Sequence, residues 1–290
     1  MKLFCRQLAN ELLKLFARKR TYLGFVGSIG TELLFLLLGR LPLARRVLEQ
    51  AFYRSMPKGI VQFDDYYQGL TMALLAVTFT FLLLGGLYLA LVCGDLVAKE
   101  VEDGTIRMIL ARPISRLRLW FLKWLTASIY TFTLVFFIGL TSLFTATALY
   151  GGVGKLAVIY GQHPHNLLLM STYESGDGLI QYVHGIILLA VVMHVVSALA
   201  FMFSCCNMKP ATATIGTLAI IFMDAVLKMV PFFFVFEKWF ISYHLACWLR
   251  AFSRLVSPLE IATSVAYMML LSVVCLSVSA YNLCHRDFKS

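Results

Sequence analysis

Four long stretches of this chain contain no Asp, Glu, Lys or Arg: residues 66–94, 124–154, 178–208 and 261–285. Each is longer than the about 20 apolar residues that a helix needs to cross a hydrocarbon core of about 30 Å. The chain of 290 residues is 60% hydrophobic and 14% charged, whereas soluble domains carry about 25% charged residues. This composition excludes a soluble domain and a disordered chain, and it predicts an integral membrane protein.

Two further apolar segments bring the number of predicted membrane-spanning helices to six. Residues 22–39 contain Glu32, and residues 211–230 contain Asp224 and Lys228. The predicted fold is therefore all-α, with one transmembrane domain over residues 1–290. Its predicted spans are residues 22–39, 69–93, 124–150, 179–204, 211–230 and 261–283.

The segments next to the spans are amphipathic or aromatic. Residues 2–20 place most apolar side chains on one side of a helix and basic ones on the other, which is typical of a helix on the bilayer surface. A helix packed on the protein is the alternative. Residues 231–258 form an aromatic outer segment, predicted to contain short re-entrant or interfacial helices. A single extra crossing is disfavoured there because Glu237, Lys238, Arg250 and Arg254 interrupt it.

The formal net charge of +10 does not indicate a nucleic-acid partner, because the basic residues stand beside apolar stretches as membrane anchors do. With the N-terminus inside and six crossings, 15 of the 25 basic residues lie on the inner side. Five basic residues of the first outer loop argue against this orientation. A re-entrant 22–39 segment would invert every later span. The five residues are Arg40, Arg45, Arg46, Arg54 and Lys58.

Sequence motifs for catalysis and nucleotide binding are incomplete. A phosphate-binding loop requires Ser or Thr after its Gly-Lys, but Gly154-Lys155 is followed by Leu156. Ser28 lies in GSIG, yet a nucleophile elbow requires Gly where Val26 stands. We therefore expect no catalytic residue, no bound metal and no cofactor in this chain.

The charged segment between the second and third spans, residues 94–123, reads GDLVAKEVEDGTIRMILARPISRLRLWFLK. It predicts a helix that continues the second span and breaks at Asp103-Gly104, followed by a short helix that Thr105 caps. Pro113 would end that helix, and Lys123 is expected to extend its ammonium towards water at the entry of the third span. An ordinary charged loop is the alternative.

This segment resembles the signature of the membrane subunits of type-2 ATP-binding cassette (ABC-2) transporters, with its acidic pair, Gly-Thr and Arg-Pro-x-Ser-Arg. The C-terminal HRDF, with Arg286 and Asp287, is similar to the usual end of that family. The resemblance implies a cytoplasmic coupling region over residues 94–123 that docks on an ATPase subunit. The coupling residues that it implies are Glu100, Glu102, Asp103, Gly104, Thr105, Arg112 and Pro113.

The resemblance also implies a permease subunit, an exporter, that forms a translocation path as a homodimer or with a paired permease. ATP and magnesium are expected in a separate ATP-binding cassette subunit. The expected location is the bacterial cytoplasmic (inner) membrane, with both termini cytoplasmic. A polytopic membrane enzyme or a membrane scaffold without transport is the alternative.

Charged and small residues within the spans are candidates for the translocation path or the dimer interface. Charges at the bilayer centre cost about 2.5–3.5 kcal/mol each, so they are expected to face protein or water. Asp224 and Lys228 stand one helical turn apart and could instead form a structural pair. Small residues near Glu32 would permit close helix approach. The candidates are Gly24, Ser28, Glu32, Asp224 and Lys228.

Overall fold

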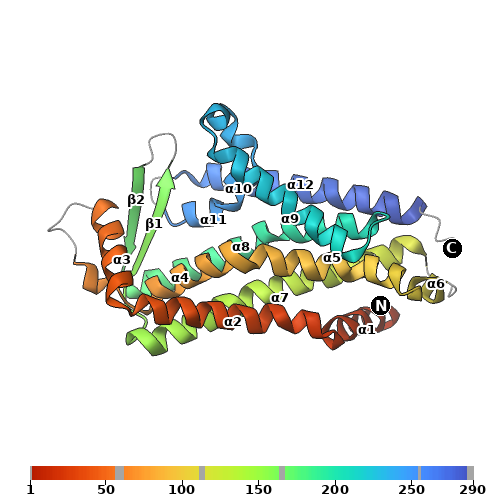
Figure 1. Cartoon of the computed structure of the whole chain (residues 1–290), viewed down its shortest axis with the longest axis horizontal. Helices are drawn as coiled ribbons and strands as arrows, with labels where there is room; N and C mark the ends of the chain where they lie inside the picture. Colours follow the sequence, from red (N-terminus) through yellow and green to blue (C-terminus); the bar gives the residue numbers. More distant parts are fainter. Residues whose placement is uncertain (1, 56–61, 111–114, 163–166, 254–255, 286–290) are drawn as a thin grey trace.

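A computed structural model of the chain describes residues 2–55, 62–110, 115–162, 167–253 and 256–285. Within these ranges, six helices are long and apolar enough to cross a membrane. They lie alongside one another in an elongated bundle (Figure 1), which confirms the predicted all-α membrane fold. The spans are α2 (Lys19–Gly39), α4 with α5 (Gly69–Glu102), α7 (Arg116–Tyr150), α8 (Ser175–Cys205), α9 (Pro210–Met229) and α12 (Pro258–His285).

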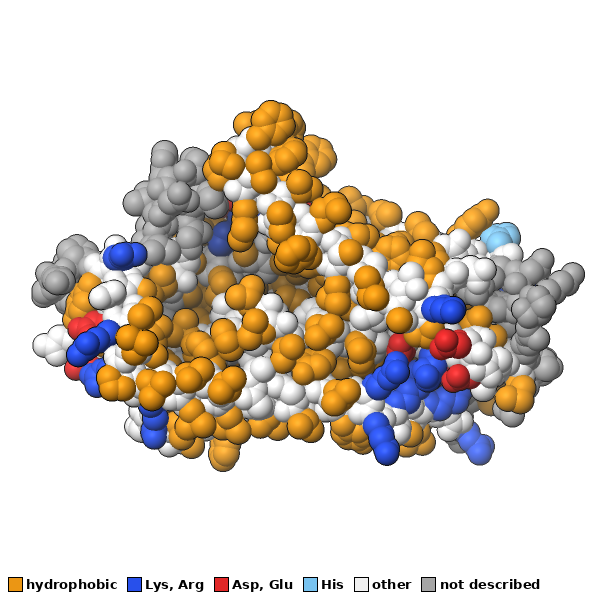
Figure 2. All heavy atoms as spheres, viewed as in Figure 1, with side chains coloured by type: hydrophobic (Ala, Val, Ile, Leu, Met, Phe, Trp, Pro, Cys, Tyr) orange, Lys and Arg blue, Asp and Glu red, His pale blue; other side chains and the backbone are white. Residues whose placement is uncertain are grey.

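The charged side chains lie mainly at the two ends of the bundle, and hydrophobic side chains cover the surface between them (Figure 2). One end carries the β-strands and will be called the hairpin end (Figure 1). The other carries the short helix α6 (Thr105–Leu110), together with α1 and the last turn of α12, and will be called the α6 end. This distribution is the one expected of helices that cross a hydrocarbon layer.

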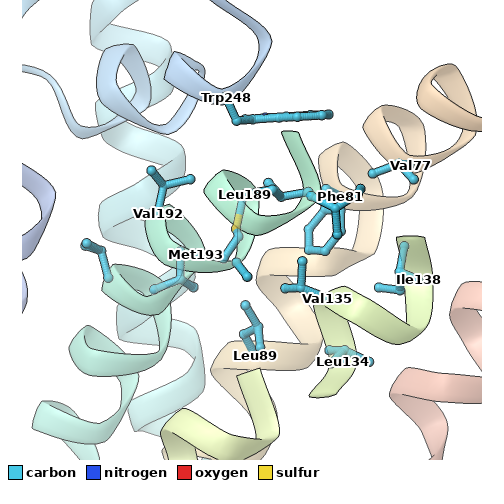
Figure 3. Close-up of a cluster of buried hydrophobic side chains, with 14 of the residues drawn as sticks. Val77, Phe81, Leu89, Leu134, Val135, Ile138, Leu189, Val192, Met193 and Trp248 are labelled. Atoms are coloured by element: carbon cyan, nitrogen blue, oxygen red, sulfur yellow. The ribbon is translucent and has the colours of Figure 1, made fainter. Parts of the chain in front are cut away.

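Helix α8 lies at the centre of the bundle and packs against α5, α7, α9 and α12. Figure 3 shows side chains of α5, α7 and α8 converging, among them Leu89, Val135 and Leu189. Close approach depends on small residues, since a Cβ added at Gly139 of α7 would lie 2.9 Å from Ile186 of α8. Lipid tails are as apolar as the helix surfaces, so the hydrophobic effect does not hold the spans together within the bilayer. Tight packing of this kind supplies the attraction between them instead.

The second span is one continuous rod with a π-helical turn, η2 (Phe81–Gly85), between α4 (Gly69–Thr80) and α5 (Gly86–Glu102). The wider turn brings the Phe81 ring over its own helix, where a Cβ at Gly85 would lie 2.2 Å from the ring. The glycine therefore accommodates the ring and allows the helix to continue towards the α6 end.

Helix α1 (Lys2–Ala17) packs against α7 and α2, with Leu15 buried. Leu3 and Leu13 remain exposed. The amphipathic helix predicted over residues 2–20 is thus present and rests on the bundle, as in the packed alternative. Its place on the bilayer surface stays a prediction.

The hairpin end contains elements that were not predicted from the sequence. Strands β1 (Leu156–Gln162) and β2 (Leu167–Tyr173) form an antiparallel pair in which Leu156 lies opposite Tyr173. Helix α3 (Pro42–Ser55) packs on β2, and the short helix η1 (Phe63–Asp65) adds Phe63 to the ring of Phe52. Arg45 of α3 forms an ion pair with Asp64. This carboxylate therefore neutralises one of the five basic residues of the predicted first outer loop.

Three short helices follow α9: η3 (Pro231–Trp239), α10 (Ile241–Leu245) and α11 (Cys247–Arg250). None is long enough to cross a membrane, in agreement with the predicted short helices before the last span. We call residues 231–250 the aromatic lobe. The first part of the lobe projects sideways from the bundle (Figure 1), and Phe232, Val235 and Trp239 are at least 73% exposed, whereas α11 packs against α8.

Candidate functional site

The predicted coupling region forms a helical hairpin at the α6 end. Helix α5 ends at Glu102, and Gly104 adopts a φ of 71°, a conformation that favours glycine. Helix α6 then folds back against α5 with Ile106 buried. The break at Asp103-Gly104 is therefore confirmed, whereas Arg112 and Pro113 lie outside the described residues, as do Arg286 and Asp287.

The acidic pair of this region points away from the bundle. Glu102 and Asp103 are exposed, and neither forms an ion pair with another residue in the described part of the chain. Thr105 is the first residue of α6, and its hydroxyl donates to the Glu100 carbonyl oxygen at 3.2 Å, while its capping of α6 stays a prediction. That bond ties the first residue of α6 back to α5. Ser115, by contrast, caps α7 by accepting from the Arg118 amide.

Glu100 is directed inward and meets Lys123 of α7. The Lys123 Nζ lies 2.7 Å from Glu100 Oε2, and the two side chains are 1% and 7% exposed. This contact is an ion pair. Lys123 also donates to the Leu96 carbonyl oxygen at 3.2 Å. The expectation that Lys123 extends to water is wrong, because the carboxylates that pair with it lie within the bundle.

The Glu100–Lys123 pair belongs to a larger group of charges. Lys123 Nζ lies 3.2 Å from Glu11 of α1, Arg18 lies 3.9 Å from Glu100, and Arg20 lies 3.0 Å from Asp95 of α5. We call this group the ionic network. It joins α1, α2, α5 and α7 beneath α6, and its members are Glu11, Arg18, Arg20, Asp95, Glu100 and Lys123.

Only Glu100 of this network was identified from the sequence. Asp95 of α5 and Lys123 of α7 lie within residues 94–123 but were not identified as part of a charged group. Glu11 of α1, Arg18 just before α2 and Arg20 of α2 are distant in the sequence, and no short-range motif links them to that segment. The signal that could have indicated them is the presence of Asp95 and Lys123 at the boundaries of apolar stretches, where a charge needs water or a partner.

The network sets the charge state of Glu11. Burial alone would raise the pKa of this carboxyl, but the ammonium groups of Lys123 and Lys14 outweigh burial and hold the pKa below its ordinary value of 4.5. Glu11 is therefore ionised at neutral pH and holds α1 to α7 through Lys123.

Helix α5 is also attached to the central helix. The Ser204 hydroxyl of α8 accepts from the Val97 and Ala98 amides, each at 2.9 Å. Gly94 lies close to α9, where its added Cβ would be 3.2 Å from the Thr214 hydroxyl. The segment of α5 that leads to α6 is thus connected to α7, α8 and α9 by named contacts.

The candidate residues of α2 share one buried face. Gly24, Ser28 and Glu32 follow one another at intervals of four residues, and Glu32 is 0% exposed. Glu32 Oε1 accepts from the Thr141 hydroxyl of α7 at 3.2 Å. A Cβ at Gly24 would lie 2.8 Å from the Tyr130 hydroxyl, also of α7. The structure therefore brings these three residues together inside the subunit.

Asp224 and Lys228 lie on α9, on the opposite side of the bundle from α2 (Figure 1). Asp224 accepts from the backbone amides of Ile241 and Ser242 at 2.9 and 2.7 Å, so it caps α10 of the aromatic lobe. Lys228 instead places its ammonium 5.6 Å from the centre of the Tyr243 ring. The structure does not form the local Asp224–Lys228 pair, because the α10 amides occupy the carboxylate.

Among the described residues, no group of three or more His, Cys, Asp or Glu side chains is placed to hold a metal ion. The α6 end instead combines a short helix with a buried group of ion pairs beside it.

Comparison with known proteins bears on this arrangement. A search of curated proteins gave no significant match. The family described as "ABC-2 family transporter protein" matches residues 28–238, more than two thirds of the chain, including α6 and five of the six spans in whole or in part. The chain therefore belongs to the ABC-2 family of transporter proteins.

Proposed function

We propose that this chain is the permease subunit of an ATP-driven exporter and pairs with a second permease, a further copy in the simplest case, to form the translocation path. The α6 end would face the cytoplasm of a bacterial cell, with both termini on that side of the cytoplasmic membrane. A separate ATP-binding cassette subunit would bind ATP and magnesium. Membership of the ABC-2 family supports this proposal.

The observation that carries the proposal is the ionic network under α6. A force applied to α6 by a docked subunit reaches α5 directly, and the Glu100–Lys123 pair passes it to α7. Removing one partner of a buried ion pair costs about 3–5 kcal/mol, so the base of α6 resists local distortion. Movement of the ATPase subunit would therefore tilt spans rather than deform the loop.

The exposed acidic pair supplies a docking surface. Glu102 and Asp103 lie at the turn beside α6, where a partner with basic side chains could reach them. We assign coupling roles to Glu102, Asp103 and Gly104 at this exposed turn, and to Glu100 and Thr105 because they connect it to α7 and α5.

The face of α2 that carries Glu32 lies inside the subunit and is our candidate for a polar part of the path. Its carboxyl faces Thr141 across the α2–α7 contact. Separation of these helices on coupling movement would expose polar groups to an interior passage.

The test is reconstitution of the chain with the ATP-binding cassette subunit encoded by a neighbouring gene. Glu102→Lys and Gly104→Pro should each abolish the permease-dependent stimulation of ATP hydrolysis while the protein still inserts. Asp65→Lys makes the same charge change at an exposed position of the hairpin end and serves as the control. Unchanged stimulation in both coupling variants would refute the coupling role.

The proposed orientation of the chain in the membrane is tested separately. A topology reporter fused after Arg46, in α3, should report the side opposite to α6. A cytoplasmic signal at this position would overturn the proposed orientation and leave the ATPase measurement unaffected.

A further inference from the structure

A cavity of about 600 Å³ lies between the aromatic lobe, β1 and the beginning of α12. Its volume is in the range of sites for small molecules, about 300–1,000 Å³. Charged side chains from three elements line it: Lys228 of α9, Glu237 and Lys238 of η3, and Arg250 of α11, with Glu260 of α12 completing the rim.

Two of these cations share one aromatic ring. The Arg250 guanidinium lies 3.9 Å from the centre of the Tyr243 ring, and the Lys228 ammonium lies 5.6 Å from it. Within the described ranges, neither cation has a carboxylate oxygen within 4.0 Å. The Arg250 Nη2 donates to the Tyr243 carbonyl and Ser264 hydroxyl oxygens, but its Nε is buried with no hydrogen-bond partner among these residues.

Asp224, one helical turn before Lys228, is already occupied. Both carboxylate oxygens of Asp224 accept from backbone amides of α10, so this group orients the lobe instead of pairing with Lys228. The cavity is lined by three cations and two carboxylates, an excess of one positive charge. Burial lowers the pKa of His244 at its floor, so this imidazole is neutral at pH 7 and does not change the balance.

Part of the remaining wall is apolar, and the lobe that contributes to it is suited to lipid. Phe234, Leu249 and Val256 line the cavity. The outer surface of the lobe exposes Phe232, Val235 and Trp239, and Figure 2 shows this projection covered with hydrophobic side chains. Aromatic side chains of this kind favour the membrane interface, at the depth of lipid headgroups.

We propose that this cavity binds the phosphodiester headgroup of an anionic membrane lipid, with Lys228 and Arg250 as its anion-binding side chains. A phosphodiester supplies one negative charge and several acceptor oxygens to cations that have no carboxylate oxygen within 4.0 Å in the described chain. The acyl chains would lie along the apolar surface of the lobe. Lipid binding requires neither an ATPase subunit nor transport, so this proposal can fail while the proposed function holds, and the reverse.

The experiment uses the full chain purified in a neutral detergent and native mass spectrometry to count bound lipid. The probes are a phosphatidylglycerol, a phosphatidylcholine of the same chain length and inorganic phosphate as a competitor. Lys228→Gln removes one cation, and Lys228→Arg retains it. Arg46→Gln removes a cation from an exposed position of α3 outside the cavity and is the matched control.

We expect Lys228→Gln to weaken phosphatidylglycerol binding about tenfold, which corresponds to about 1.4 kcal/mol. Lys228→Arg and Arg46→Gln should bind as the unaltered chain does, and phosphatidylcholine should bind more weakly to all of them. Equal binding by Lys228→Gln, or equal binding of the two lipids, would overturn the proposal. Displacement by inorganic phosphate at matching concentrations would identify a free anion as the ligand and overturn the lipid assignment.

Arg250→Gln tests the second cation, but this change also removes hydrogen bonds that hold α11. The midpoint of thermal unfolding of the Arg250→Gln variant is therefore compared with that of the Lys228→Gln variant. A variant that keeps its midpoint and still binds phosphatidylglycerol fully would exclude Arg250 from the site.

Discussion

The Lys123 ammonium and the Glu100 carboxylate lie 2.7 Å apart at the point where the chain leaves α5 for α6 and returns into α7. Both side chains are less than 10% exposed. The pair thus closes the base of the α6 hairpin inside the protein. The physical consequence is that α6 and the two adjacent spans are connected through a contact that water does not weaken.

Lys123→Met should lower the free energy of unfolding by about 3–5 kcal/mol, because the buried Glu100 and partly buried Glu11 carboxylates lose their shared cation. Glu100→Gln should be destabilising as well. The loss of unfolding free energy in the double variant should be smaller than the sum of the losses in the two single variants, since each change removes the same contact. Denaturant unfolding in detergent micelles measures this coupling, and strictly additive losses would show that the pair contributes no joint stability.

Acid should loosen α1. The pKa of Glu11 in the folded protein is below its ordinary value of 4.5, so its stabilising contribution is fully present above pH 4.5 and is lost as the pH falls through the folded value. The difference in thermal midpoint between the unaltered protein and Glu11→Gln should therefore be constant from neutral pH to 4.5 and shrink below it. A difference that persists unchanged in acid would contradict this role for Glu11.

Two glycines of α2 should respond oppositely to alanine. A Cβ at Gly27 would lie 1.8 Å from the Tyr88 hydroxyl, whereas a Cβ at Gly30 meets no atom within 4 Å. Gly27→Ala should cost about 1–3 kcal/mol through overpacking, and Gly30→Ala should be neutral or add up to about 1 kcal/mol of helix stability. Thermal unfolding compares the two. Tyr88→Phe should recover part of the Gly27→Ala loss, and its failure to do so would exclude the hydroxyl contact as the cause.

Asp224 should control the first turn of α10 independently of Lys228. Asp224→Ala removes the acceptor for the Ile241 and Ser242 amides, and a lost cap is worth about 1 kcal/mol. Hydrogen exchange at these two amides should rise about fivefold to tenfold, while Lys228→Ala leaves it unchanged. Equal increases in both variants would indicate that the two side chains act as a pair after all.

The membrane fold was predictable because transfer into lipid depends on local composition. Any apolar stretch of sufficient length forms a spanning helix, whatever its neighbours, since the bilayer leaves its backbone no other partner. Segments 22–39 and 211–230 satisfied this condition despite Glu32 and Asp224. The helices run past their apolar parts, so that α5 reaches Glu102 and α7 begins at Arg116, because charged ends of a helix extend into water.

The hairpin end was not predictable in the same way. Strand β1 is stabilised by pairing with β2, and Leu156 meets Tyr173 across the sheet. The apolar residues of both strands do not alternate strictly with polar ones, so the period of two that identifies a strand is absent. Helix α3 likewise packs through Phe52, which is buried against the rings of Phe63 and Tyr66 from outside the helix.

The sequence by itself determined that this chain spans a membrane and that a turn at Gly104 presents a short helix, because hydropathy and backbone conformation are properties of neighbouring residues. Only the tertiary structure decided where the charges find their partners. Glu100 meets Lys123, and Asp224 meets the α10 amides in place of Lys228 one turn away. In a low-dielectric interior a charge is retained only where another group satisfies it, and the packing of distant helices selects that group.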